Sequence, residues 1–284
     1  MPFFTSYDGL RLHYHELGVG PPVVALPGGP GMDSRYLADL GGLTVHRRII
    51  FADARAAGRS AVPDDRTTVS FTAQARDVES LRRHLQLDRI DVLAHSAGCL
   101  TAQEHAARFT GTVRRLVLVA PVGRAAREPD PAELAALRAS RHGEPWYTDS
   151  AEADRLLREG AAASEQAMLQ ARLTPFYWHR WSAERRAEYV PGHATPLPWL
   201  RDAFYAGSAT ADTAAQRLAR LAASRVPVLV LAGASDGMSG TAPARAVAEC
   251  HSGGRLEIMP GSGHRPWVEE PGLFRELVTG FLDG

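Results

Sequence analysis

Apolar residues follow two spacings along this chain of 284 residues, and the two spacings alternate. A hairpin pattern with an Asp-Gly turn comes first, at 3–18. Short continuous runs rich in Val, Leu and Ile then predict buried strands at 21–29, 46–53, 89–95, 113–121, 226–233 and 254–261. Amphipathic spacing predicts helices at 71–87, 97–109, 242–250 and 273–282. This alternation predicts an α/β fold, a mostly parallel sheet with helices on both faces.

The pattern changes between residues 123 and 213. Continuous apolar runs stop there, Ala, Arg and Glu predominate, and aromatic residues gather in clusters such as "TPFYWHRW" at 174–181. The strands predicted before and after this region have the same apolar pattern, as strands of one sheet would. We therefore expect one core domain, formed by residues 1–122 and 214–284, interrupted by a helical cap at 123–213.

The composition excludes several classes of protein. Acidic and basic side chains number 32 each, so we expect no surface for nucleic acid. No run of eighteen apolar residues is present to span a membrane, and no secretion signal is expected. Cys99 and Cys250 are too few for a disulfide framework, which favours a reducing, cytoplasmic compartment. Arginine supplies every basic side chain, which is typical of a GC-rich genome.

The segment "DVLAHSAGCL" at 91–100 places Ser96 at the turn between a predicted strand and a predicted helix. A serine there is either the N-cap of the helix or the nucleophile of a strand–turn–helix elbow. The elbow needs small residues two positions before and after the nucleophile, because its strained turn brings backbone segments close together. Gly98 meets this need, and Ala94 exceeds the usual glycine by one methyl group.

A serine nucleophile needs a histidine base that a carboxylate orients. Asp236 and His264 each follow one of the last two predicted strands. Taken singly, Asp236 is consistent with a turn residue and His264 with a surface loop. Three such residues past three strand ends, in the order Ser, Asp, His, predict a catalytic triad of Ser96, Asp236 and His264.

Acyl transfer by a serine also needs backbone N–H groups that stabilise the oxyanion. The residue after the nucleophile, Ala97, supplies one of them. The second is expected from Gly29 in "ALPGGPGMDS" at 25–34, since glycines let a backbone amide face a ligand without obstruction by a side chain. The other interpretation of this segment is a surface turn built from proline and glycine.

Four segments resemble the prolyl aminopeptidase (proline iminopeptidase) family of α/β-hydrolases. They are "PGGPG" at 27–31, "DARAAGRS" at 53–60, the elbow at 94–98 and "GSGHRPWVEEP" at 261–271. The resemblance implies a cap over a Ser-Asp-His triad and cleavage of an N-terminal residue, often proline, without cofactor or metal. It also implies that the second oxyanion amide is that of Gly29.

The chain departs from this family in two places. Pro27 stands where the family has a histidine before the glycines. The family also holds the free ammonium of its substrate with cap glutamates. Glu184 is our candidate for this role, with Trp181 beside it at the substrate and with Glu188 and Glu144 as further candidates. The other interpretation is that these glutamates are solvated helix charges. The aromatic residues of the cap either line an apolar acyl site or form the cap's own core.

Three classes of function are consistent with these features. The first is a serine amidohydrolase of prolyl-aminopeptidase type. It releases an aminoacyl residue from a short peptide or from an aminoacylated small molecule, such as a polyketide or macrolactam intermediate of antibiotic biosynthesis. The second is a carboxylesterase or C–C bond hydrolase with the same triad. The third is an inactive binding protein, against which an intact triad argues.

Overall fold

An eight-stranded sheet forms the centre of the molecule. The computed structural model describes residues 2–122, 126–188, 197–206 and 211–284. The strands are β1 (Phe3–Thr5), β2 (Arg11–Leu17), β3 (Pro22–Leu26), β4 (Arg48–Ala52), β5 (Ile90–His95), β6 (Val113–Val119), β7 (Val228–Gly233) and β8 (Arg255–Met259). Their order is β1-β2-β4-β3-β5-β6-β7-β8. The strands β3 to β8 pair in parallel, and the β1–β2 hairpin joins β4 antiparallel.

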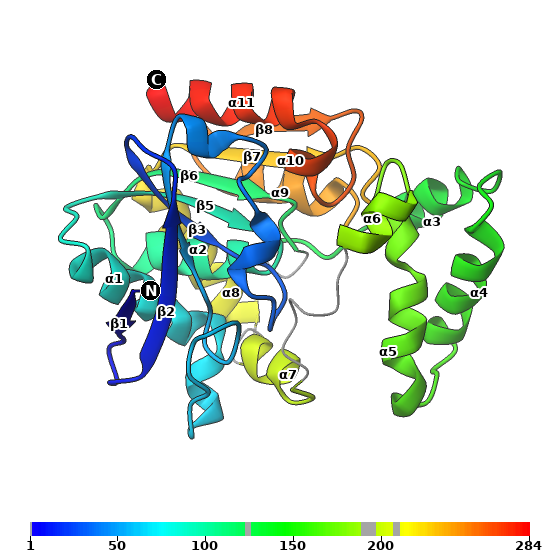
Figure 1. Cartoon of the computed structure of the whole chain (residues 1–284), viewed down its shortest axis with the longest axis horizontal. Coiled ribbons are helices and arrows are strands. Elements are labelled where there is room, and N and C mark those ends of the chain that lie inside the picture. Colours follow the sequence, from blue (N-terminus) through cyan, green and yellow to red (C-terminus); the bar gives the residue numbers. More distant parts are fainter. Residues whose placement is uncertain (1, 123–125, 189–196, 207–210) are drawn as a thin grey trace.

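Helices cover both faces of this sheet (Figure 1). One face packs on α1 (Phe71–His84), α2 (Gly98–Arg108), α8 (Ala211–Ser224) and α9 (Ala242–Cys250). The other face packs on the 3₁₀ helix η1 (Ser34–Leu37), α10 (Pro266–Glu269) and α11 (Pro271–Asp283). The predicted fold class, a mostly parallel sheet between two helical layers, is confirmed.

The central strands alternate between two apolar clusters, one on each side of the sheet. On β5, Val92 and Ala94 pack toward α1 and α2, whereas Leu93 packs toward the layer of α11. Because both faces are buried, every residue of β5 is buried, and the sequence of its middle part, Val92 to Ala94, is continuously apolar. Residues just past the carboxyl ends of β5, β7 and β8 therefore meet at one edge of the sheet.

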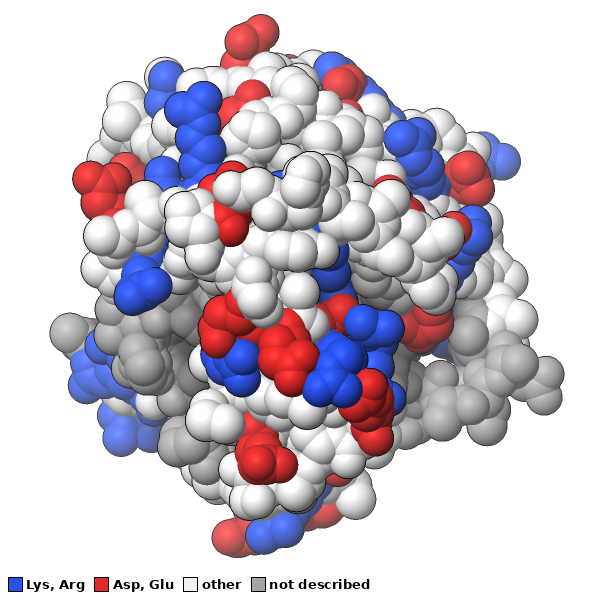
Figure 2. All heavy atoms as spheres, turned by 90° about the vertical axis from the view of Figure 1, so that its right-hand side faces the viewer, with Lys and Arg blue, Asp and Glu red and all other residues white. Residues whose placement is uncertain are grey.

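In the described part of this stretch, five α-helices lie between β6 and α8 along the chain. They are α3 (Pro131–Ala139), α4 (Tyr147–Arg158), α5 (Ala163–Arg172), α6 (Ala183–Glu188) and α7 (Leu200–Tyr205). In Figure 1, α3, α4 and α5 stand to one side of the sheet. Figure 2 views that side and shows arginines interleaved with acidic residues. The ion pairs of Arg155 with Glu152 and Glu159 on α4 are of this kind. The division into a core and a cap at 123–213 stays a prediction.

The aromatic residues of the cap belong to two different places. Trp146, Tyr147 and Phe176 pack into a small apolar cluster between α4, α5 and the 3₁₀ helix η5 (Thr174–Tyr177). Phe204 on α7 instead joins the core cluster under the sheet. The interpretation as the cap's own core therefore describes the first group, and an acyl site lined by aromatic residues stays a prediction.

Two glutamates attach the cap region to the core. The Glu133 carboxylate on α3 accepts the N–H groups of Thr241 and Ala242, which begin α9. The Glu269 carboxylate accepts the N–H groups of His179 and Arg180. Each of these carboxylates accepts hydrogen bonds from backbone groups on the opposite side of the junction.

None of the described helices is long and apolar enough to cross a membrane.

Buried histidines make stability depend on pH. Burial lowers the pKa of His105 and of His251 to about 4. The unfolded chain, with histidine pKa values of about 6.5, takes up protons in the window between about 6.5 and 4 that the folded protein does not. We therefore expect the free energy of unfolding to fall on going from pH 7 to pH 5, by about 2 kcal/mol per ring.

Urea unfolding at the two pH values measures this loss. A His105→Gln variant should lose less stability than the wild type by about 2 kcal/mol over the same interval. The exposed His142 gives the matched control, His142→Gln, which should behave like the wild type. Equal losses in the wild type and in His105→Gln would contradict the expectation.

Candidate active site

Ser96 occupies a sharp corner between β5 and α2. Its φ of 53° lies in the left-handed region, which non-glycine residues rarely adopt. A Cβ on Gly98 would lie 2.4 Å from the carbonyl oxygen of Pro27, so only glycine fits there. The extra methyl group of Ala94 is accommodated in the apolar core. The first turn of α2 has no side-chain cap, so Ser96 is not its N-cap.

The structure brings Ser96, Asp236 and His264 together. The Ser96 Oγ lies 3.1 Å from His264 Nε2, and His264 Nδ1 lies 2.8 Å from Asp236 Oδ2. The other carboxylate oxygen, Asp236 Oδ1, accepts the N–H groups of Met238 and Ser239. With these two donors and the Nδ1–H of His264, both oxygens of the buried carboxylate accept hydrogen bonds. His264 Nε2 is then the unprotonated nitrogen that faces the hydroxyl.

The cap region contacts both loops that carry the predicted base and the predicted acid. The N–H of His264 donates to the carbonyl of Tyr177 at 2.7 Å, and the N–H of Gly237 donates to the carbonyl of Phe176 at 3.0 Å. A Cβ on Gly263 would lie 2.2 Å from the Tyr177 carbonyl oxygen. Glycine beside His264 therefore lets η5 lie directly against the loops of the predicted base and acid.

The loop after β3 lies against the predicted nucleophile, Ser96. A Cβ on Gly28 would lie 2.8 Å from the Cβ of Ser96. Gly29 has a φ of 120°, open to glycine and strained for other residues. Neither the Gly29 N–H nor the Ala97 N–H has an acceptor among the described residues. Both predicted oxyanion donors are thus available for an incoming oxygen.

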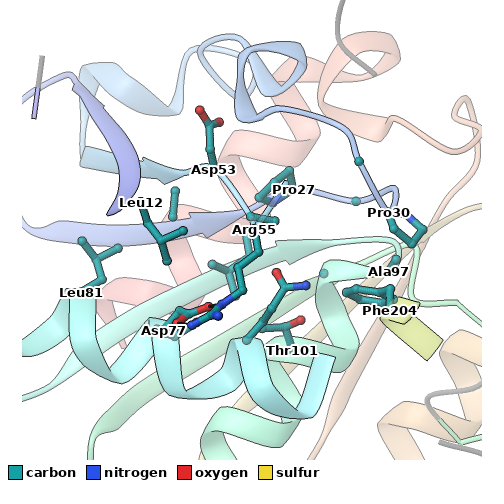
Figure 3. A pocket seen from close by; sticks show the side chains of 18 of the residues that line it. Leu12, Pro27, Pro30, Asp53, Arg55, Asp77, Leu81, Ala97, Thr101 and Phe204 are labelled. Carbon is teal, nitrogen blue, oxygen red and sulfur yellow. Dashed lines mark hydrogen bonds and ion pairs between the residues drawn. The ribbon is translucent and has the colours of Figure 1, made fainter. Parts of the chain in front are cut away.

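An apolar cavity reaches Ala97 and the residues on either side of Gly29, Gly28 and Pro30 (Figure 3). Its empty volume is about 640 Å³, with the open solvent at its mouth included. Pro30 and Ala97 line it together with apolar side chains, among them Leu12, Leu81 and Phe204. The polar part of the lining includes Asp53, Arg55, Gln74, Asp77 and Thr101.

The acids of this cavity already have partners. Both oxygens of Asp77 accept from Arg55, at 2.6 and 2.7 Å. Asp53 accepts from His13 Nδ1 at 2.8 Å and from the N–H and hydroxyl of Ser34. Figure 3 shows the Asp53 carboxylate directed away from the other labelled side chains. Neither carboxylate is therefore free to bind a substrate cation.

A family model described as alpha/beta hydrolase fold matches residues 21–271. The chain belongs to this α/β-hydrolase family. In this α/β-hydrolase the predicted nucleophile Ser96 follows β5, the predicted acid Asp236 follows β7 and the predicted base His264 follows β8.

Several proteins are similar to this α/β-hydrolase. The proline iminopeptidase of Lactobacillus delbrueckii subsp. bulgaricus is 24% identical over 92% of this chain and 89% of its own. The 2-hydroxy-6-oxo-2,4-heptadienoate hydrolase of Pseudomonas putida is 31% identical over 40% of this chain and 42% of its own. An esterase from Exiguobacterium antarcticum shares the fold with a TM-score of 0.70 and 20% identity, with 99% of both chains covered. The similarity to proline iminopeptidases predicted from the motifs is confirmed.

The predicted substrate residues of this hydrolase lie apart from a water-excluding pocket. Glu184 is exposed on α6, and its role at the substrate ammonium stays a prediction. Trp181 is partly exposed, with the guanidinium of Arg186 6.0 Å from its ring. Glu144 is half-buried and accepts from Arg141. The side chain of Glu188 lies outside the described residues.

Sequence reasoning missed two polar side chains that lie next to the triad. His95 directly precedes Ser96 in the chain. Its ring does not bond the hydroxyl, but its Nε2 lies 2.9 Å from the backbone oxygen of His264. Tyr36 lies 2.6 Å from the other ring nitrogen of His95. The position of His95, directly before the predicted nucleophile, was a sequence signal that it lies near the site. Tyr36 is 59 positions from His95 in the chain and gave no such signal.

Among the described residues, no three His, Cys, Asp or Glu side chains gather as metal ligands would.

Proposed function

We propose that this chain is a serine amidohydrolase of prolyl-aminopeptidase type that works through an acyl-enzyme. The observation that carries the proposal is the hydrogen-bonded series Ser96, His264, Asp236 at an elbow with two available amide groups. Nucleophile, base, orienting acid and oxyanion donors are the four parts that acyl transfer by serine requires.

The proposed reaction proceeds in two halves. His264 Nε2 takes the proton of Ser96 as Oγ attacks the substrate carbonyl, and the N–H groups of Ala97 and Gly29 hold the oxyanion. The protonated His264 then gives its proton to the leaving amine, which departs and leaves an ester on Ser96. Water attacks this ester with His264 as the base, which releases the acid and restores the serine.

The proposed substrate carries an aminoacyl group with a free amine. Similarity to proline iminopeptidases over most of both chains supports this substrate class. The molecule that loses the aminoacyl group is a short peptide or an aminoacylated natural-product intermediate.

The second candidate is a carboxylesterase or C–C bond hydrolase. The apolar cavity beside Ala97 and Pro30 favours it, because the carboxylates Asp53 and Asp77 in the cavity are already paired. An uncharged acyl or alkyl group fits such a lining, whereas a buried ammonium without a partner costs several kcal/mol.

A panel of three substrate types separates the two candidates. It contains aminoacyl-arylamides, the same compounds with blocked amines, and p-nitrophenyl esters. Amide cleavage that needs the free amine supports the aminopeptidase type, and hydrolysis of esters alone supports the second candidate. Absence of turnover in the whole panel, with Ser96 unreactive to a fluorophosphonate, would refute both.

A Glu184→Gln variant tests the cap glutamate. Because Glu184 is exposed, its interaction with an ammonium is screened by water and is worth about 0–1 kcal/mol. We expect the ratio of kcat/KM for a free-amine amide to kcat/KM for an uncharged ester to fall less than about fivefold. Glu165→Gln, at another exposed cap position, is the matched control. A fall of tenfold or more for Glu184→Gln alone would show that Glu184 enters a desolvated site in the complex.

A further inference from the structure

A chain of hydrogen bonds connects the oxyanion loop to the backbone of the predicted base. The N–H of Gly28 lies 2.6 Å from the Tyr36 hydroxyl, and this hydroxyl lies 2.6 Å from His95 Nδ1. His95 Nε2 lies 2.9 Å from the carbonyl oxygen of His264. Three segments far apart in the sequence, at the ends of β3, β5 and β8, are thereby joined through two side chains.

The partners fix the position of each proton. A carbonyl oxygen only accepts, so His95 Nε2 carries the proton that it donates to His264. The other nitrogen of a neutral ring accepts, so the Tyr36 hydroxyl donates to His95 Nδ1. The Tyr36 oxygen keeps a lone pair for the Gly28 N–H. All three bonds are satisfied by one arrangement of protons.

Burial keeps both side chains in the protonation states that this arrangement needs. Tyr36 and His95 are 7% and 3% exposed. Burial raises the pKa of the Tyr36 phenol, so the phenol stays protonated. Burial above all, with the charge of Arg265 acting in the same direction, holds the pKa of His95 well below its ordinary value, so the ring stays neutral.

The rings around these hydrogen bonds limit their movement. The His95 ring packs edge-on against the ring of His264, with centroids 4.7 Å apart. The buried Trp267 packs edge-on against His95 at 4.8 Å. A polar group buried among aromatic rings is costly to leave unpaired, so the loss of one partner shifts the others.

We propose that Tyr36 and His95 are positioning residues, which hold the Gly28–Gly29 loop and the His264 loop at a fixed place relative to Ser96. Neither side chain touches the reacting atoms. Their effect is to place the Gly29 N–H where the oxyanion forms, and to hold the His264 ring beside the Ser96 hydroxyl. This inference rests on the proposed function, since it assigns the residues to that same site.

A Tyr36→Phe variant tests the proposal, because it keeps the ring and removes the hydroxyl. The Gly28 N–H then loses its acceptor and His95 Nδ1 its donor. Complete removal of an oxyanion donor costs about 10²–10³ in kcat, so we expect its displacement to lower kcat by about 10–100-fold, with KM within about twofold. The rate constant for fluorophosphonate modification of Ser96, followed by mass spectrometry, should fall by a similar factor and needs no known substrate.

The chain offers a matched control in Tyr14, a buried tyrosine whose hydroxyl lies 3.3 Å from the ring of His84. Tyr14→Phe removes the same group from a tyrosine–histidine pair elsewhere in the fold. Its Tm should fall as that of Tyr36→Phe does, while kcat and the modification rate stay at the wild-type values. A purely structural role for Tyr36 would give the two variants the same kinetics.

Two substitutions of His95 provide an independent readout. His95→Asn places an amide oxygen near the Nδ1 position, where it can accept from Tyr36, and loses the hydrogen bond to the carbonyl oxygen of His264. His95→Gln has a longer side chain, which extends toward the Nε2 position. If the connection acts as one unit, the Tyr36→Phe/His95→Asn double variant loses little more than the worse single variant. Additive losses would show two independent contacts and would overturn the proposal.

The outcomes separate this inference from the proposed function. A wild-type protein that a fluorophosphonate does not modify at Ser96 contradicts the proposed function itself. A second outcome is that the reagent modifies the wild type and also modifies the folded Tyr36→Phe and His95→Asn variants within threefold of the wild-type rate. This outcome overturns the positioning role alone. Should Tyr36→Phe fail to fold, His95→Asn carries the same test.

Discussion

Ser96→Ala is expected to remove nearly all turnover, by a factor on the order of 10⁶, as loss of the nucleophile does in other triads. The substitution deletes one oxygen atom, and its only described hydrogen-bond partner is His264. Alanine adopts the strained φ of 53° about as readily as serine does, so the elbow should keep its shape. Substrate binding should therefore survive, with KM within a few-fold.

The measurement is kcat on the best substrate of the panel. Circular dichroism and Tm show that each variant is folded. Ser150→Ala is the matched control, since Ser150 is a buried serine of α4 whose hydroxyl bonds the carbonyl of Arg172. It should keep wild-type turnover. A Ser96→Ala variant with a tenth of the wild-type kcat would reject Ser96 as the nucleophile.

The core of the fold was predictable because its signals are local. The strand predicted at 89–95 is β5 (Ile90–His95), and the helix predicted at 71–87 is α1 (Phe71–His84). Buried parallel strands have to be apolar on both faces, and α1 has to be apolar on one, so each leaves its own periodicity in the sequence. The Asp-Gly hairpin at the N-terminus is β1 and β2 for the same reason.

That Ser96, Asp236 and His264 lie together could be predicted for a topological reason. A parallel sheet gathers its carboxyl ends at one edge, so residues past β5, β7 and β8 had to come together. This rule places residues that directly follow a strand. It gives no information about side chains that reach the site from elsewhere, such as Tyr36 on η1.

Long-range polar pairs and the cap left no such signal. The pairing of Arg55 with Asp8 and Asp77 depends on how a loop folds back onto α1 and the hairpin. Glu184 was selected because aromatic residues surround it in the sequence. Several of those aromatics pack into the cap's own cluster, and the helix that carries Glu184 leaves it exposed. Neighbours in sequence on a short helix do not determine which side chain faces the site.

Asp236→Asn is expected to lower kcat by about 10⁴-fold, the effect of the same change in a well-studied triad. The reason here is the set of partners around the carboxylate. Oδ1 accepts two backbone N–H groups, from Met238 and Ser239, so an asparagine has to place its oxygen there. Its NH₂ group then faces His264 Nδ1. The ring must accept at Nδ1 and carry its proton on Nε2, where it cannot take the proton of Ser96.

The structure supplies a matched control in the second buried aspartate–histidine pair, Asp53 and His13, also 2.8 Å apart. Asp53→Asn should lower Tm, because Asp53 also accepts from Ser34, but kcat should stay within about tenfold of the wild type. For Asp236→Asn the loss should lie in kcat, with Tm changed little and KM within a few-fold, since the hydrogen bonds to Met238 and Ser239 survive. If the two variants lost turnover equally, the orienting acid would no longer be assigned to Asp236. If Asp53→Asn alone were inactive, the base would have to be sought at His13.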